Sequence, residues 1–293
     1  MLRPIFAGIV LPIICALIAA LLTSLLRRRP GPWTDRVGWE GALLLVSVVV
    51  CHVALVGWPG FPPTDVKFWP LFIALAGVPL AAMGTAIGRW PVRLAVQVIV
   101  IGAGSALLLR PELQSLSVAG CALMLAIVMA AWLATAWVWS LSASSATPGA
   151  SMTALLVTTG ATAIAVLLFG TFTYAQVVGI GAIALAVLAL MHWWGGMPRI
   201  GASSVALATA VLLPMWWLLG ATMADLPRWA PVLFIAAGAS SWISVLPVIS
   251  RLSGWKRIAC VALVAITIVS PVLVVGIVAS MHQSASSGGG DGY

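Results

Sequence analysis

The feature that most constrains this chain is a long stretch without charge. Residues 113–198 contain no Asp, Glu, Lys or Arg, and Leu, Val, Ile and Ala dominate them. A membrane-spanning helix needs about 20 consecutive apolar residues to cross roughly 30 Å of hydrocarbon. The stretch is long enough for three such helices, so it predicts a protein that crosses the bilayer several times.

The composition of the whole chain leads to the same class of protein. Of its 293 residues, 62% are hydrophobic and 7% are charged, whereas about a quarter of the residues in soluble domains are charged. This excludes a water-soluble fold. The net charge of +8 does not predict nucleic acid as a partner, because the basic residues are scattered along short loops and form no patch with exposed aromatic residues.

Ten apolar runs are separated by short connections. We expect membrane spans at residues 4–26, 41–57, 68–87, 92–109, 117–141, 152–172, 174–194, 201–223, 229–250 and 258–280. The runs at 41–57 and 92–109 are the shortest, so eight or nine spans remain an alternative. The predicted fold is an all-α polytopic transmembrane helical bundle. Residues 1–280 form one membrane domain without a soluble domain, and residues 281–293 form a disordered tail.

The distribution of positive charge predicts the orientation of the chain in the membrane. With ten spans, the odd-numbered connections contain ten of the 14 Lys and Arg residues. Loops rich in Lys and Arg stay in the cytoplasm. We therefore expect a protein integral to the plasma (inner) membrane, with cytoplasmic odd-numbered loops and both termini outside. Most tryptophans fall near predicted span ends, as in aromatic belts, and only Trp132 and Trp242 lie deeper.

The two spans within the uncharged stretch are expected to form a tight helical hairpin. Its turn is predicted at Thr171, Thr173, Tyr174 and Gln176, the cluster there with enough hydrogen-bonding groups to lie at an interface. Each helix has one face of small residues, at Thr158, Ala161, Thr162 and Ala165 on the first and at Gly179, Ala182, Ala186 and Ala189 on the second. Small residues let membrane helices approach closely. These faces are expected to be packing seams, and a solute path between them is the alternative.

Acidic residues are absent from the predicted span centres. All six map to loops, helix ends or the tail, at Asp35, Glu40, Asp65, Glu112, Asp225 and Asp291. A charge at a span centre costs about 2.5–3.5 kcal/mol on insertion scales, so one that is kept there usually has a function. Its absence argues against proton- or sodium-coupled transport and against intramembrane hydrolysis. The four cysteines form no CxxC pair, and we expect no catalytic residue, no cofactor and no metal site.

Six residues are candidates for the lining of a cavity. Ser240, Ser241 and Ser244 give the ninth span the most polar centre, Pro79 and Pro214 interrupt the third and eighth spans, and His52 lies within the second. The alternative for the serines is hydrogen bonding across helices or to the preceding turn. The alternative for His52 is a neutral imidazole bonded to a neighbouring helix.

The prolines are candidates because each removes a backbone hydrogen bond within its helix. Pro79, Pro214 and Pro247 are expected to free the carbonyl groups of Leu75, Ala210 and Ile243. If the ten spans were a duplicated five plus five, the third would correspond to the eighth, and transporters often place broken helices at such matched positions. Coincidence is the alternative, because proline is common in membrane helices.

Three functions are compatible with this pattern, since no motif identifies a substrate or a reaction. The first is a non-enzymatic transmembrane subunit, or a permease component energised by a partner, which packs in the bilayer against other membrane subunits or forms a homo-oligomer. The second is a stand-alone facilitator for a neutral or lipophilic solute, with a cavity between the third, eighth and ninth spans. The third is a membrane enzyme acting on lipids, which needs loop pairs such as His52 with Asp65 or Asp225 with Arg228.

Overall fold

The computed structural model describes residues 6–27, 37–63, 65–83, 90–169, 172–195 and 199–287. These residues are mainly helical and contain no strand, so the predicted all-α membrane bundle is confirmed. The principal helices are α2 (Leu11–Arg27), α3 (Trp39–Val56), α4 (Trp69–Met83), α5 (Trp90–Leu108), α7 (Val118–Ser145), α8 (Pro148–Leu168), α9 (Phe172–Gly195), α10 (Arg199–Met223), α11 (Ala230–Ala239) and α13 (Gly254–Ser287). Shorter turns are η1 (Phe6–Val10), η2 (Val66–Phe68), α6 (Arg110–Leu113), η3 (Ser240–Val245) and α12 (Pro247–Ser250).

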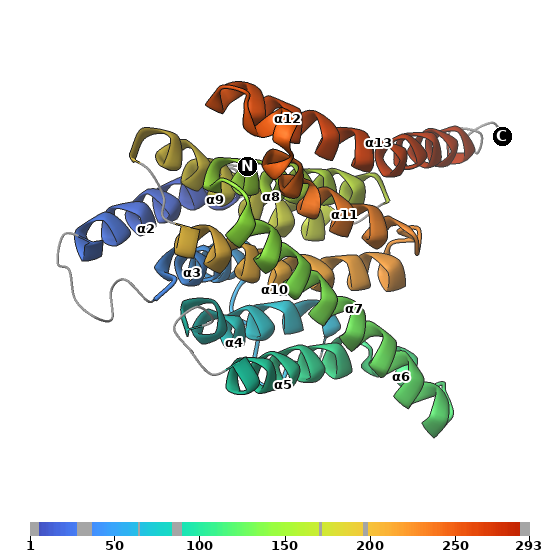
Figure 1. Ribbon diagram of the computed structural model, residues 1–293. Helices are drawn as coiled ribbons and strands as arrows, with labels where there is room; N and C mark the ends of the chain where they lie inside the picture. The colour runs from blue at the N-terminus through green and yellow to red at the C-terminus, as the bar shows by residue number, and fades with distance from the viewer. Residues whose placement is uncertain are drawn as a thin grey trace.

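Helical structure occurs in each of the ten ranges where a span is expected. Within the described residues, seven helices are long and apolar enough to cross a bilayer. Three shorter apolar segments cover Gly8–Ala19, Trp69–Ala82 and Ala230–Val245. The axes of most helices are roughly aligned, and the helices form a single bundle (Figure 1). Whether the three shorter segments cross the membrane completely stays a prediction.

Helix α10 lies at the centre of this bundle (Figure 1). It packs against α3, α4, α7 and α8, and 83% of its span is buried. Small side chains, among them Ala202, Ala206 and Ala210, are fully buried along its length. Because small residues let neighbouring helices approach closely, α10 can be surrounded on several sides and becomes the helix around which the others pack.

The N-terminal half of α10 meets the start of α3 and the end of α4 in a contact we refer to as the glycine junction, formed by Gly38, Gly41, Gly201 and Ser204. A Cβ atom on Gly41 would lie 2.2 Å from the backbone oxygen of Ser204, and one on Gly38 would lie 2.3 Å from the Ser204 Cβ. Any larger residue at these positions would force the helices apart. The junction therefore requires glycine.

The Ser204 hydroxyl joins three chain segments at this junction. It accepts a hydrogen bond from the Gly41 N–H at 3.2 Å. Its oxygen lies 2.5 Å from the carbonyl oxygen of Gly38 and 2.9 Å from that of Ala81, so its single proton is shared between them or donated to one. One small hydroxyl thus connects the start of α3, the end of α4 and the first turns of α10.

The Glu40 carboxylate packs against the first turn of α10. A Cβ atom on Gly201 would lie 2.8 Å from the Glu40 carboxyl carbon, and Glu40 is only 4% exposed. The N-terminal end of a helix favours a negative charge because of its unpaired N–H groups and its dipole. The acid lies at a helix end, as expected, but no pattern in the sequence indicated that it is buried.

The predicted hairpin is formed by α8 and α9, which pack along each other. Its turn is not where the sequence placed it. Helix α8 ends at Leu168 and α9 begins at Phe172, so Thr173, Tyr174 and Gln176 belong to the first turns of α9. Thr171 lies outside the described residues. Polar residues at this interface continue a helix because their backbone groups still gain helical hydrogen bonds.

The two small-residue faces of the hairpin differ in how deeply they are buried. On α8, Thr158, Thr162 and Ala165 are fully buried and form a packing seam as predicted. On α9, Ala182 and Ala186 are only partly buried, and a Cβ atom on Gly179 would meet nothing within 4 Å. The α9 prediction holds for Ala189, which is buried, and is wrong for the other three residues, because a small-residue face permits a close contact without requiring one.

The segment expected as the ninth span, residues 229–250, is divided into α11, η3 and α12. The backbone turns at Leu246, where ψ is 139°, and Pro247 begins α12. Because the helix ends before Pro247, the Ile243 carbonyl accepts a hydrogen bond from the Leu246 N–H at 3.0 Å. The prediction that Pro247 leaves this carbonyl free is therefore wrong.

Candidate functional site: a cleft between α7, α10 and α11

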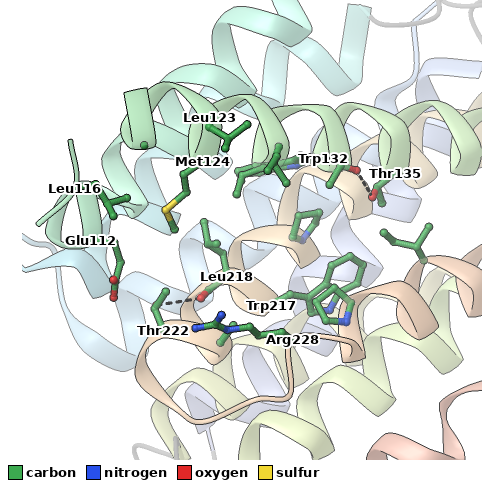
Figure 2. Close-up of a pocket in the computed structure, with 18 residues that line it drawn as sticks. Glu112, Leu116, Leu123, Met124, Trp132, Thr135, Trp217, Leu218, Thr222 and Arg228 are labelled. Atoms are coloured by element: carbon green, nitrogen blue, oxygen red, sulfur yellow. Dashed lines mark hydrogen bonds between the residues drawn. The ribbon is translucent and has the colours of Figure 1, made fainter. Parts of the chain in front are cut away.

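A cavity of about 850 Å³ lies between α7, α10 and α11 (Figure 2), and we refer to it as the cleft. This volume is within the roughly 300–1,000 Å³ typical of small-molecule sites. One face of α7 forms one wall, and α10 with α11 forms the opposite wall. The lining residues are Glu112, Leu116, Gly120, Leu123, Met124, Ile127, Val128, Ala131, Trp132, Thr135, Pro214, Trp217, Leu218, Ala221, Thr222, Arg228, Pro231 and Ile235.

The inner end of the cleft is built around Pro214. This proline cannot donate to the carbonyl of Ala210, four residues back in α10. The Trp132 indole N–H of α7 donates to that carbonyl instead, at 2.8 Å. The sequence predicted a free carbonyl at Ala210 and placed Trp132 deep in its span. The structure pairs the two, so Pro214 fixes α10 to α7 at the inner end of the cleft.

An aromatic cluster closes the cleft beyond this point. The Trp217 ring stacks on Phe234 at 5.5 Å and meets the edge of Trp139 at 5.9 Å between ring centroids. The Trp217 indole donates to the Thr162 hydroxyl at 3.1 Å, and the Trp139 indole donates to the Ile235 carbonyl at 3.0 Å. The sequence placed Trp139 and Trp217 near opposite membrane interfaces, whereas the structure brings their rings into contact.

The hydroxyl and indole groups that line the cleft are bonded within the protein. Thr135 donates to the Ala131 carbonyl at 2.8 Å, and Thr222 donates to the Leu218 carbonyl at 3.0 Å. The indole N–H groups of Trp132 and Trp217 are also occupied. The walls therefore offer no free donor among these groups to a ligand and present mainly aliphatic and aromatic carbon.

Charged side chains line only the outer end, which we refer to as the mouth. Glu112 comes from α6 and Arg228 from the connection between α10 and α11. Both side chains are exposed. Figure 2 shows Glu112 at the end of the cleft that is far from Thr135, and the Arg228 side chain between Trp217 and Thr222, pointing toward that end; it draws no interaction between the two. Neither makes an ion pair with another described residue.

Of the six candidate cavity residues, only Pro214 lines the cleft. Pro79 is exposed on α4. Ser240, Ser241 and Ser244 are no more than 5% exposed. The Ser241 hydroxyl bonds to that of Ser142, and the Ser244 hydroxyl donates to the Ser241 carbonyl at 2.7 Å. Ser241 thus pairs across helices and Ser244 bonds back to the preceding turn, as the alternative interpretation expected.

His52 lines a separate, very small pocket of about 10 Å³. Its neighbours there are apolar: Val48, Val49, Pro70, Leu71, Ala74, Val177, Leu212 and Trp216. The His52 Nε2 atom has no hydrogen-bond partner among the described residues. The pocket lining contains no Asp65, so the structure does not bring together the His52 and Asp65 pair that a lipid enzyme would need.

Only one member of the second pair that a lipid enzyme would need lines the cleft. Asp225 and Arg228 share the connection between α10 and α11, but only Arg228 lines the cleft. Asp225 is exposed and has a left-handed backbone with φ of 51°. Within the described ranges, no group of three or more His, Cys, Asp or Glu side chains is placed to hold a metal ion.

Two polar contacts between helices were not identified from the sequence. The thiols of Cys15 in α2 and Cys51 in α3 lie next to each other. The Gln97 side chain of α5 is 1% exposed and accepts from the Trp137 indole at 3.3 Å. Each is a single residue in its own span, so no local spacing pattern could have paired them.

The packing does not support a five-plus-five duplication. Helix α3 packs along α4, whereas the pair that would correspond to it, α9 and α10, makes only slight contact. Pro79 lies on the exposed side of α4, and Pro214 faces the central cleft. Comparison of the sequence with models of known protein families gives no match. Comparison with curated proteins likewise gives none.

Proposed function

We propose that this protein is a non-enzymatic facilitator that binds a lipophilic molecule in the cleft and moves it along α7. The single observation that carries the proposal is the cavity of about 850 Å³ with apolar walls and charged groups only at its mouth. An apolar cavity in a membrane-spanning bundle favours a ligand drawn from the lipid phase. The cavity lies between the fifth, eighth and ninth spans, so the fifth replaces the third in the facilitator hypothesis.

The proposed direction of access follows from the ends of the helices. The mouth lies at the N-terminal end of α7 and the C-terminal end of α10. In the orientation predicted from the positive charges, both are at the outer surface of a plasma (inner) membrane. The glycine junction supports this arrangement, because it joins the start of α3, the end of α4 and the start of α10, all of which adjoin odd-numbered loops.

A matched pair of alanines on α7 tests the proposal. Both Ala130 and Ala131 are exposed, but only Ala131 lines the cleft. The protein would be reconstituted in liposomes that contain a phospholipid with a photoreactive diazirine in its acyl chain. We expect cross-links concentrated on residues 120–135 and on α10, strongly reduced by Ala131→Trp and unchanged by Ala130→Trp. Transfer of a labelled lipid between leaflets should follow the same order.

Two results would contradict the proposal. One is cross-linking spread evenly over the lipid-facing helices without enrichment in the cleft. The other is equal cross-linking and equal lipid transfer in the Ala131→Trp and Ala130→Trp proteins. Since both variants add the same indole to neighbouring positions of one helix, a general effect of a larger side chain on α7 would appear in both.

A transmembrane subunit is the second candidate, and one observation favours it. The start of α7 projects from the bundle together with α6 (Figure 1). Val118, Leu123 and Ile127 there are 87%, 63% and 60% exposed. A partner helix could cover this part of α7. Purification in mild detergent, followed by mass spectrometry of co-migrating chains, distinguishes the two, because a stable lone monomer that still binds lipid would argue against a subunit.

A further inference from the structure

The mouth of the cleft combines one negative and one positive side chain from different parts of the chain. Glu112 belongs to α6, and Arg228 precedes α11. Figure 2 shows the Arg228 side chain extending along the edge of the cleft toward the end where Glu112 lies. Because no ion pair joins them in the described structure, both charges are available to a ligand whose polar end carries both signs.

The attachment of α6 holds Glu112 near the start of α7. The Cys121 thiol of α7 donates to the Leu113 carbonyl of α6 at 3.1 Å. The Ser115 hydroxyl donates to the Glu112 carbonyl at 2.8 Å. These bonds link the short α6 turn to the wall of the cleft, so the backbone that carries the Glu112 side chain is held beside the apolar walls.

The length of the cleft matches one leaflet of a bilayer. The lining residues of α7 extend from Gly120 to Thr135, a distance of about 22 Å at 1.5 Å per residue. One leaflet, with its head groups, contributes about half of the roughly 40–45 Å thickness of a bilayer. Charges at one end followed by apolar walls of this length reproduce the polarity profile of a phospholipid, with the head group at the mouth and an acyl chain along α7.

The chemistry of the mouth distinguishes between head groups. A quaternary ammonium is usually bound by aromatic rings, but the outer lining residues Glu112, Leu116, Thr222 and Arg228 include no aromatic side chain. A primary ammonium can instead donate hydrogen bonds to the Glu112 carboxylate, while the Arg228 guanidinium binds a phosphate. We infer that the cleft selects lipids with a primary ammonium and a phosphate in the head group, the chemistry of phosphatidylethanolamine. This inference rests on the proposed function.

Lipid retention by the full-length protein tests the inference. The purified protein in mild detergent would be incubated with phosphatidylethanolamine, phosphatidylcholine and phosphatidylglycerol of identical acyl chains. Native mass spectrometry then measures the bound fraction of each. We expect phosphatidylethanolamine to be retained about twofold to fivefold better than phosphatidylcholine, the range for the one exposed charge contact that differs between the two lipids. Glu112→Gln should remove this preference, and Arg228→Gln should weaken retention of all three lipids.

Two variants serve as controls on charge alone. Arg110→Gln and Asp225→Asn change neighbouring exposed charges that do not line the cleft, and both should retain the wild-type preference. Asn tolerates the left-handed backbone at position 225.

The double exchange of Glu112→Arg with Arg228→Glu should keep selectivity, because the lipid head group can reverse its orientation. Equal midpoints of thermal unfolding would show that the variants are folded.

The outcomes separate this inference from the proposed function. If lipids are retained without a preference for phosphatidylethanolamine, or if Glu112→Gln keeps the preference, the head-group inference is wrong. The proposed function still stands in that case, provided that Ala131→Trp removes retention of all three lipids. If the wild-type protein retains no more lipid than the Ala131→Trp protein does, both are wrong.

Discussion

The two halves of α10 pack differently: one is in close contact with neighbouring helices, and the other faces an open cleft. At its N-terminal half, the glycine junction brings α3 and α10 so close that a Cβ atom on Gly41 has no room. At its C-terminal half, from Pro214 to Thr222, the same helix faces the cleft. The Ser204 hydroxyl of the junction bonds to other helices, whereas the Thr222 hydroxyl of the cleft bonds to its own helix. Close contact at one end fixes α10 and lets its other end leave space for a ligand.

The largest loss of stability is expected from adding a side chain at the glycine junction. Gly41→Ala would place a Cβ atom 2.2 Å from the Ser204 backbone oxygen, so the two helices must separate. Overpacking of this kind costs roughly 3 kcal/mol. Gly160→Ala on α8 is the control, because a Cβ atom there meets nothing within 4 Å. The free energy of unfolding in mixed micelles measures both, and equal values would show that the junction is not tight.

A smaller loss is expected from removing the hydroxyl at the junction. Ser204→Ala leaves the Gly41 N–H and the carbonyl groups of Gly38 and Ala81 without this partner in a buried site. Unpaired buried groups cost about 2 kcal/mol. The control is Ser144→Ala, whose exposed hydroxyl bonds only to the Leu141 carbonyl of its own helix. The same unfolding titration should show almost no change for that variant, and a similar loss in both would contradict the role given to Ser204.

A further, smaller loss of stability is expected at the inner end of the cleft, where a double-mutant cycle can test the hydrogen bond. Trp132→Phe removes the donor to the Ala210 carbonyl, and Pro214→Ala restores a backbone N–H that can serve this carbonyl. Trp132→Phe should cost about 1–2 kcal/mol in the natural chain. In the Pro214→Ala background the loss should be about 1 kcal/mol smaller. Additive losses would mean that the indole and the proline act independently.

The sequence predicted the parts of this fold that depend on composition along one helix. The apolar runs predicted the helical ranges, and the proline rule identified the Ala210 carbonyl as a group in need of a donor. The rule could not identify Trp132 as that donor, because the two residues are 78 positions apart and meet only when α7 packs against α10. The proline rule, which uses only spacing within one helix, therefore identified an acceptor without its helical donor. The packing of α7 against α10 determined which residue donates to it.

The cavity predicted from the sequence was assigned to the wrong set of spans for a related reason. Ser240, Ser241 and Ser244 were selected because they make one span polar, but polar groups in a bundle also pair with each other, as Ser142 and Ser241 do. A cavity instead depends on which faces remain uncovered. The projecting start of α7 leaves such a face (Figure 1), and this depends on the arrangement of all the helices. The burial of Glu40 had the same origin, since Gly201 makes room for it from a distant span.

The smallest effect is expected from a hydroxyl inside the cleft. Thr135→Val removes a group that bonds only to the Ala131 carbonyl of the same helix. Because that carbonyl keeps its helical N–H partner, the loss should be below about 0.5 kcal/mol. The new methyl group adds apolar surface to the wall, so retention of phospholipid in native mass spectrometry should be unchanged or slightly higher. A large loss of stability, comparable with that of Ser204→Ala, would show that cleft hydroxyls stabilise the bundle as junction hydroxyls do. The contrast between the two halves of α10 would then disappear.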